Sequence, residues 1–244
     1  MVSLCFDIGN TFTKLAVFKN NEIINFRTID KDNITVVDQI IEENQVETAI
    51  VSSVSEIPDL LVTTLENKIG KVIRLTAETK LPIENCYETK ESLGKDRLAS
   101  VVGANYLYPG IDLLIIDAGT AIKYDFINHK SQYLGGDISP GLQMRFKALH
   151  QFTNRLPLVE TNFESYLYGK NTTDAIRAGV QNGMIFEIDG TIDHFKELYP
   201  GLKVLFTGGD AKFFDNKLKN VIFVLSNLVM IGLNRILVYN VQNI

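Results

Sequence analysis

Leu4-Cys5-Phe6-Asp7-Ile8-Gly9 and Leu114-Ile115-Ile116-Asp117-Ala118-Gly119 are the two stretches of sequence that decide the fold. They match in residue type at every position, and Asp117 follows Asp7 by 110 residues. Each copy predicts an apolar strand, Asp-x-Gly, a turn rich in threonine, a second strand, a short polar turn and a third strand. A repeat of this length predicts two structurally similar halves rather than a stack of short units.

The rest of the sequence alternates short apolar runs with amphipathic segments, which indicates an α/β fold. Strands are predicted at 2–6, 14–18, 23–29, 49–54, 71–75, 112–116, 122–127, 131–134 and 203–206. Helices are predicted at 33–43, 57–68, 96–107, 142–154, 173–187, 189–197 and 224–238. Turn residues cluster at Tyr108-Pro109-Gly110, so we expect one half over residues 1–109 and the other over residues 110–244.

The charge balance argues against a nucleic-acid partner. The 244 residues include 24 Lys and Arg against 29 Asp and Glu, for a formal net charge of −5. Binding to a phosphate backbone needs a basic face, which this balance does not favour. Hydrophobic residues make up 45% of the chain, so it is not a disordered protein.

We expect a cytoplasmic protein without membrane association. The N-terminus lacks the basic region and apolar run of a signal peptide. Two cysteines are too few for a disulfide framework, and the three histidines have no metal-ligand spacing. The longest apolar stretch, residues 221–241, contains Asn234 and Arg235, which are costly in hydrocarbon, so a buried amphipathic helix is the better interpretation.

The first repeat continues as Asp7-Ile8-Gly9-Asn10-Thr11-Phe12-Thr13-Lys14, a pattern suited to holding phosphate. Asp7 at the strand end can hold Mg²⁺ through water, Gly9 lets backbone amides approach a ligand, and Lys14 adds a cation. A plain hairpin turn would use the same residue types. The second copy favours phosphate, because an ATP cleft between two halves requires two such hairpins. The sequence contains neither a P-loop nor a dinucleotide fingerprint.

Two further motifs each allow a functional and a structural interpretation. Gly94-Lys95-Asp96-Arg97 places Asp96 either as a helix cap or as a general base with Arg97 beside it, and its spacing alone favours the cap. Thr207-Gly208-Gly209-Asp210-Ala211 follows a strand, where paired glycines either form a simple turn or lie flat against adenine.

Taken together, the motifs resemble type III pantothenate kinases, within the acetate/sugar kinase and actin-like superfamily. The matching segments occur in the family's order over nearly the full chain, at 7–11, 94–97, 117–121, 135–141 and 207–211. The resemblance implies a duplicated ribonuclease H-like fold with mixed sheets flanked by helices. It also implies a homodimer that phosphorylates pantothenate to 4'-phosphopantothenate with ATP, the first step of coenzyme A biosynthesis.

The resemblance assigns a role to each matched residue. Asp96 is the expected catalytic base, Asp7 lies near Mg²⁺, and Asp117 is a ligand of a monovalent cation, K⁺ or NH₄⁺. The expected ATP contacts are Asp7, Ile8, Gly9, Asn10, Thr11, Phe12, Thr13, Lys14 and Thr120. The expected pantothenate contacts are Tyr87, Gly94, Lys95, Asp96, Arg97 and, across the dimer interface, Thr172.

Two positions depart from the family pattern. Lys123-Tyr124-Asp125 stands where the family usually has Thr-x-Asp, and Lys90 replaces a common proline between Tyr87 and Gly94.

Two alternative functions also remain: another small-molecule phosphotransferase or phosphohydrolase of the same fold, and a nucleotide-sensing regulatory relative without turnover. A screen of acceptor compounds would separate the first alternative from a pantothenate kinase. ATP binding without ADP release that depends on a hydroxyl acceptor would favour the second alternative.

Overall fold

The two copies of the repeated sequence fold into the same local structure, two antiparallel strands joined by a tight turn. Strand β1 (Val2–Ile8) pairs with β2 (Phe12–Lys19), and β7 (Leu113–Ala118) pairs with β8 (Ala121–Ile127). In each turn a glycine amide donates to the first carbonyl of the second strand, Gly9 N to Phe12 O at 3.0 Å and Gly119 N to Ala121 O at 3.1 Å. The computed structural model describes residues 1–9, 12–30, 35–53, 57–164 and 167–242.

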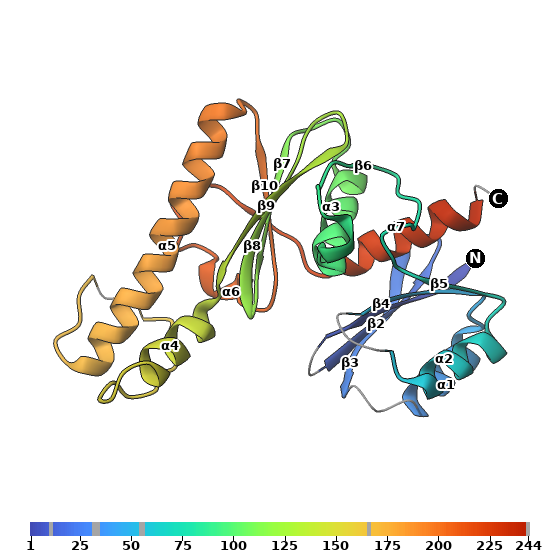
Figure 1. Ribbon diagram of the computed structural model, residues 1–244, viewed down its shortest axis with the longest axis horizontal. Helices are drawn as coiled ribbons and strands as arrows, with labels where there is room; N and C mark the ends of the chain where they lie inside the picture. Colours follow the sequence, from blue (N-terminus) through green and yellow to red (C-terminus); the bar gives the residue numbers. More distant parts are fainter. Residues whose placement is uncertain (10–11, 31–34, 54–56, 165–166, 243–244) are drawn as a thin grey trace. The chain divides into compact units, whose positions relative to one another are not determined.

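The first compact unit contains a five-stranded sheet in the order β3-β2-β1-β4-β5 (Figure 1). Its other elements are α1 (Thr35–Asn44), α2 (Asp59–Lys68), β3 (Glu22–Asp30), β4 (Thr48–Ser53) and β5 (Lys71–Arg74). The strands β1, β2 and β3 are antiparallel, whereas β1, β4 and β5 are parallel. The turn between β2 and β3 is formed by Asn20 and Asn21, both with positive φ, as a tight two-residue hairpin requires.

Alternate residues of β1 face different helices. Leu4, Phe6 and Ile8 join a buried cluster with apolar residues of α1 and α2. The side chain of Ser3, on the opposite face, donates to Asn234 Oδ1 at 2.6 Å, and Asn234 belongs to α7 (Leu228–Gln242). The sheet of the first unit is therefore covered on both faces, in agreement with the continuous apolar runs of β1 and β4.

Helix α3 (Lys95–Leu107) packs against α7 through a pair of glycines. A Cβ at Gly103 would meet the carbonyl of Leu228, and a Cβ at Gly232 would collide with the carbonyl of Ala99. The two helix backbones approach each other this closely because neither residue has a side chain.

The compact units do not follow the expected division at residue 109/110 throughout. The first unit comprises residues 1–109, 131–133 and 227–244, and the second comprises 110–130 and 134–226. Helix α7 groups with the first unit because it packs on α3 and on the sheet through contacts such as the one from Ser3 to Asn234.

The second unit is built on β7 and β8, together with β9 (Gln132–Pro140), β10 (Lys203–Thr207) and the short β11 (Phe223–Val224). These strands lie in the order β11-β10-β7-β8-β9. The first two residues of β9 pair with β6 (Glu84–Asn85), and all four of these residues belong to the first unit.

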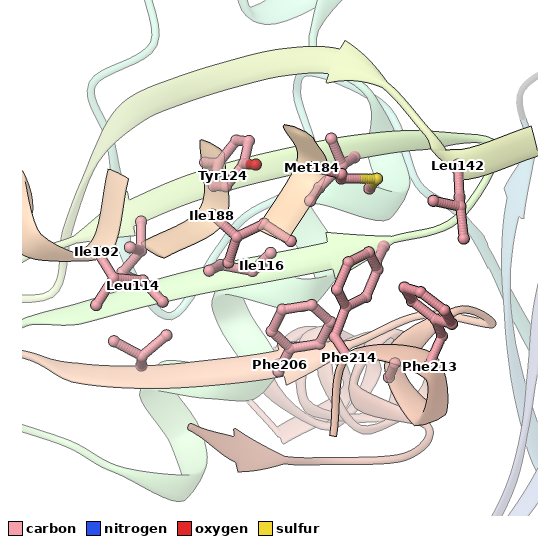
Figure 2. Packing of buried hydrophobic residues seen from close by; sticks show 14 of the residues in the cluster. Leu114, Ile116, Tyr124, Leu142, Met184, Ile188, Ile192, Phe206, Phe213 and Phe214 are labelled. Atoms are coloured by element: carbon pink, nitrogen blue, oxygen red, sulfur yellow. The ribbon is translucent and has the colours of Figure 1, made fainter. Parts of the chain in front are cut away.

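A single buried cluster joins one face of this sheet to the helices of the second unit, α4 (Leu142–Gln151), α5 (Thr172–Leu198) and α6 (Ala211–Phe214). Figure 2 shows Leu114 and Ile116 of β7 packed with Met184, Ile188 and Ile192 of α5. Leu114 and Ile116 occupy the repeat positions of Leu4 and Phe6. The repeated sequence therefore directs the same alternation towards helices in both units.

Several predicted boundaries were wrong. The prediction of two helices at 173–187 and 189–197 fails because α5 is continuous and buries Ile188 completely. The last helix begins at Leu228 rather than at 224, because residues 223–224 pair with β10 and Asn227 adopts positive φ. The strand predicted at 131–134 continues to Pro140. No helix among the described residues is long and apolar enough to cross a membrane.

Candidate active site

The first Asp-x-Gly turn places its residues in different environments. Asp7 is half-buried and lies directly opposite Lys14 in the β1–β2 register, while Lys14 and Phe12 are exposed. Ile8 and Thr13 are buried, so their side chains face the interior. Asn10 and Thr11, which were expected to contact ATP, lie outside the described residues.

The second turn is braced by two glycines from elsewhere in the second unit. The amide of Gly141 donates to Thr120 O at 3.1 Å, and a Cβ at Gly141 would collide with the carbonyls of Gly119 and Thr120. Gly208, at φ +100°, packs against Ala118 O, so a side chain there would also collide. The side chain of Thr120 remains exposed at the tip of the turn.

Asp117 has a cationic partner within the same hairpin. It lies opposite Lys123 in the β7–β8 register, and Lys123 Nζ is 3.0 Å from Asp117 Oδ2. Only 16% of the Asp117 side chain and 19% of the Lys123 side chain are exposed. This pair is partly shielded from water, and the residue that departs from the family pattern forms it.

The glycine pair Gly208-Gly209, which follows β10, lies against the second turn. The amide of Asp210 donates to Ala118 O at 3.0 Å, which ties the Gly208-Gly209 turn to the strand that carries Asp117. Gly209 is exposed, with open space around its Cβ position. Burial raises the pKa of the Asp210 carboxyl above its ordinary value. The arrangement is a βα turn, and its exposed glycine leaves room for a flat group.

The Gly94-Lys95-Asp96-Arg97 motif forms the start of α3. Gly94 is the cap residue, and Asp96 lies in the first turn rather than at the cap. A Cβ at Gly94 would lie 2.7 Å from Asp96 Oδ1, so this glycine makes room for the carboxylate. Lys95 Nζ donates to Ser53 O at 3.2 Å, which ties the motif to the end of β4. A carboxylate in the first turn of a helix is stabilised in its ionised form.

The aromatic residue before this motif lies beside it in the structure. The guanidinium carbon of Arg97 is 5.4 Å from the ring centroid of Tyr87. Arg97 is buried, Tyr87 is half-buried, and both belong to the first unit. The ring of Tyr87 also stacks with the ring of Tyr133, with the ring centroids 6.1 Å apart and an angle of 12° between the ring planes.

Tyr133 is a residue that sequence reasoning missed. It is completely buried, and its carbonyl accepts from Cys86 N at 3.0 Å. Tyr133 itself belongs to no motif, and the pairing of β6 with β9 brings it beside Tyr87. Between Tyr87 and Gly94, the one-turn helix η1 (Lys90–Ser92) begins at Lys90, the residue that replaces the family's common proline.

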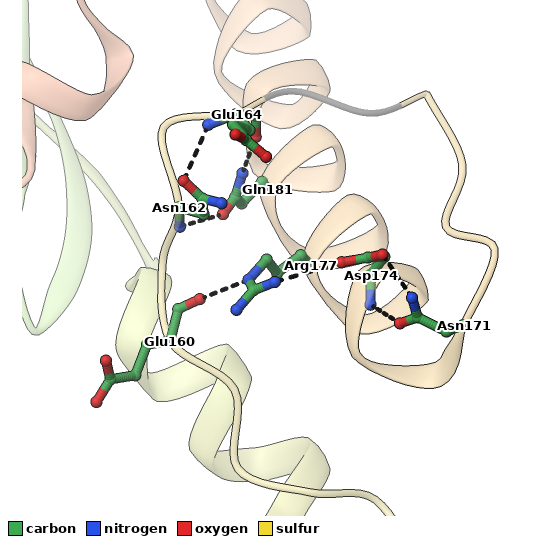
Figure 3. Close-up of polar contacts among 7 residues, drawn as sticks. All are labelled: Glu160, Asn162, Glu164, Asn171, Asp174, Arg177 and Gln181. Atoms are coloured by element: carbon green, nitrogen blue, oxygen red, sulfur yellow. Dashed lines mark hydrogen bonds and ion pairs between the residues drawn. The ribbon is translucent and has the colours of Figure 1, made fainter.

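Thr172 lies at the start of α5. The cap of this helix is Asn171, whose Oδ1 accepts from Asp174 N at 2.9 Å. Figure 3 shows how residues of α5 hold the segment that precedes it: Arg177 Nε donates to Glu160 O, and Gln181 Oε1 accepts from Asn162 N. Thr172 thus lies on a well-anchored helix end.

A groove of about 880 Å³ adjoins Thr172 along α4 and α5. Its lining includes Arg145, Leu149, Leu156, Lys170 and Ile176, and it contains no residue of the Asp117 turn. Of the expected site residues that the structure describes, only Thr172 lines this groove.

The fold and the paired Asp-x-Gly turns define a kinase of the actin-like superfamily. Two solved structures share the fold over nearly the full length of both chains. A Campylobacter jejuni protein assigned to the Baf family of transcriptional activators has a TM-score of 0.65 and 25% identity, with 98% of this chain and 99% of that chain covered. The activator of 2-hydroxyisocaproyl-CoA dehydratase from Clostridium difficile, solved with bound ADPNP, has a TM-score of 0.53 and 13% identity, with 98% and 94% covered.

The chain belongs to the type III pantothenate kinase family. The family model for type III pantothenate kinase matches residues 3–194. A type III pantothenate kinase from Phocaeicola vulgatus is 45% identical over 239 residues, which cover 98% of this chain and 99% of that protein. One from Bacteroides fragilis is 46% identical over 239 residues, with 98% of both chains covered. Membership implies the use of ATP and of a divalent metal ion.

Proposed function

We propose that this chain transfers the γ-phosphoryl group of ATP to the primary hydroxyl of pantothenate, and that the motif at the start of α3 carries the acceptor chemistry. The observation that carries this proposal is the fit of Gly94 to the Asp96 carboxylate, with Arg97 and Tyr87 beside it. A kinase of this kind needs one carboxylate near the hydroxyl and a cationic or polar group to hold the acceptor.

In the proposed reaction Asp96 takes the proton of the pantothenate hydroxyl. The hydroxyl oxygen forms a bond to the γ-phosphorus, the bond from that phosphorus to the bridging oxygen breaks, and ADP leaves. Arg97, held over the Tyr87 ring, is suited to bind the pantothenate carboxylate, because a guanidinium offers several fixed donors. Lys95 is a less direct contact, because its ammonium donates to Ser53 O.

The two Asp-x-Gly turns are the proposed phosphate-binding elements. In the first, the exposed Lys14 can meet phosphate oxygens, and Gly9, which has no side chain, lets the phosphates approach the turn. The half-buried Asp7 fits a magnesium ion that keeps most of its water. When bound, the magnesium ion would neutralise charge on the β- and γ-phosphates. In the second, Thr120 can donate from the tip of the turn. Ile8 and Thr13 are buried, so only their backbone groups can take part.

The adenine is proposed to lie on the turn after β10. Gly209 is exposed with nothing within 4 Å of its Cβ position, and Gly208 keeps the turn close to Ala118. We propose that the activity lies in the cytoplasm, where the co-substrate ATP is available.

The functional form is proposed to be a homodimer, with a second copy of this chain covering the region around the α4–α5 groove. Large apolar side chains in the segment between α4 and α5 are exposed, with Phe152 at 85%, Leu167 at 81% and Tyr168 at 70%. Exposed apolar surface of this kind is typical of an interface. Light scattering should give twice the monomer mass for the wild type, and Leu167→Glu should shift it towards the monomer; a wild-type monomer at micromolar concentration would contradict the dimer.

Measurement of ADP release tests the proposed function. Purified protein with ATP and Mg²⁺ should release ADP only when pantothenate is added, and the product should carry the phosphate on its primary hydroxyl. ADP release with another alcohol but not with pantothenate would favour a different acceptor. ATP binding without any acceptor-dependent release would favour a regulatory role and would contradict the proposal.

A further inference from the structure

The Asp117 carboxylate is enclosed by this chain's own atoms. Its Oδ2 lies 3.0 Å from Lys123 Nζ. Its Oδ1 lies under the turn after β10, where it is one of the atoms that a Cβ at Gly208 would meet, at 2.6 Å. Both side chains of the pair are more than four-fifths buried. One oxygen therefore has an ammonium partner, and the other has a backbone against it.

A monovalent cation fits poorly at this carboxylate. A cation placed on Asp117 would lie beside the ammonium of Lys123, and the two like charges repel more strongly because water is partly excluded. The Asp117 charge is already balanced by Lys123.

The position of Lys123 follows from the strand register. Lys123 pairs with Asp117 as Lys14 pairs with Asp7 in the first hairpin. Lys14 is exposed, whereas only 19% of the Lys123 side chain is exposed. The second hairpin thus holds its lysine against the aspartate in a partly buried pair.

We propose that the ammonium of Lys123 supplies the positive charge that the family resemblance assigns to K⁺ or NH₄⁺ at Asp117, so that this chain works without a monovalent cation. A lysine ammonium carries the same single charge as these ions and is a compact group with three donors. The inference rests on the proposed function for its kinetic test, but it also makes a prediction about ion binding that needs no turnover.

The kinetic test compares KCl with choline chloride at equal ionic strength. For the wild type, kcat/KM for pantothenate should differ by less than about twofold between the two salts, because both screen charges equally at the same ionic strength. Lys123→Thr, which restores the family's usual residue, should lose at least about tenfold in choline chloride and regain activity in KCl or NH₄Cl. Lys130→Thr, at an exposed lysine of the turn between β8 and β9, is the matched control and should behave as the wild type.

The second measurement is the melting temperature with a non-hydrolysable ATP analogue and Mg²⁺, again in KCl against choline chloride. K⁺ should not raise the wild-type Tm, whereas it should raise that of Lys123→Thr, because only a bound ion stabilises the fold by mass action. A wild type that needs K⁺ for turnover, or that K⁺ stabilises, overturns the inference. If the wild type is inactive in both salts, the proposed function is wrong. The melting temperatures in the two salts then test the inference about Lys123 without any turnover.

Discussion

The guanidinium of Arg97 lies over the ring of Tyr87, with its central carbon 5.4 Å from the ring centroid. Arg97 comes from the first turn of α3 and Tyr87 from the segment before η1, and Tyr87 is supported in turn by the buried ring of Tyr133. A cation over an aromatic face is attracted by the electrons of the ring. The relationship therefore fixes the orientation of the group that we assign to the pantothenate carboxylate.

Replacing Arg97 should weaken pantothenate binding more than it slows turnover. Arg97→Met keeps much of the buried side-chain volume and removes the charge, so KM for pantothenate should rise by about tenfold or more while KM for ATP changes little. Steady-state kinetics with each substrate varied in turn checks this. Arg74→Met, at an exposed arginine paired with Glu66, is the control. Equal increases in both KM values would contradict the assignment.

Tyr87→Leu should have a smaller effect of the same kind. The substitution removes the ring under Arg97 and its stack with Tyr133, but it leaves the guanidinium itself. KM for pantothenate should rise by roughly twofold to thirtyfold, which corresponds to the usual range of a cation–π contact. The same kinetic measurements apply, and a double variant with Arg97→Met should show less than the sum of the two effects in free energy. Additive effects would mean that the two residues act independently.

Asp96→Asn tests the proposed base. The amide has the same shape but accepts a proton far less readily, so kcat should fall by about 10²–10⁴. Binding of a non-hydrolysable ATP analogue, measured by calorimetry, should stay within about twofold because the change is isosteric. Gly94→Ala should also lower kcat, because its Cβ would lie 2.7 Å from Asp96 Oδ1 and displace the carboxylate. Near-normal turnover of Asp96→Asn would remove this residue from the role of base.

The sequence predicted the parts of the site that are local in the chain. Asp-x-Gly followed by a second strand was enough to predict both hairpins and their strand-end carboxylates, because a tight turn and alternating burial are short-range properties. The start of α3 at the Gly94 motif was predicted for the same reason. The place of Tyr133 could not be predicted, since it depends on the pairing of β6 with β9. The hairpin sets Lys123 opposite Asp117, but the sequence left open whether the lysine side chain turns to the carboxylate or to solvent.

The errors in the fold have the same physical origin. The continuous α5 was predicted as two helices because its apolar pattern is irregular, and the packing of Ile188 against β7 decides its continuity. Residues 223–224 were assigned to the last helix by their apolar character, but they pair with β10. Tertiary pairing overrides local preference at these two places. The grouping of α7 with the first unit is likewise set by its contact with α3.

Replacing Asp210 should reveal the cost of its burial. Burial raises the pKa of this carboxyl above its ordinary value of 3.8, so the folded protein holds the proton more tightly than the unfolded chain does. The stabilisation by the protonated form is complete below pH 3.8 and is lost as the pH rises through the raised value. Asp210→Asn should therefore gain stability relative to the wild type as the pH rises through this range, measured by urea unfolding. Asp215→Asn, at an exposed neighbour, is the control, and a difference independent of pH would contradict this origin.

The close packing of α3 and α7 makes Gly232 the position where an added methyl group should cost the most. A Cβ there would collide with the carbonyl of Ala99, which is backbone and can move only if the whole helix shifts. Gly232→Ala should lower the free energy of unfolding by about 1–3 kcal/mol, the usual cost of overpacking. Gly190→Ala is the matched control, because Gly190 is an exposed helical glycine with nothing within 4 Å of its Cβ position. It should instead raise stability by about 0.5–1 kcal/mol, the gain expected from alanine in a helix interior. Urea unfolding of the two variants and the wild type measures whether each substitution lowers or raises the free energy of unfolding. If both substitutions stabilise the protein, α3 and α7 do not approach each other at Gly232 as the structure describes.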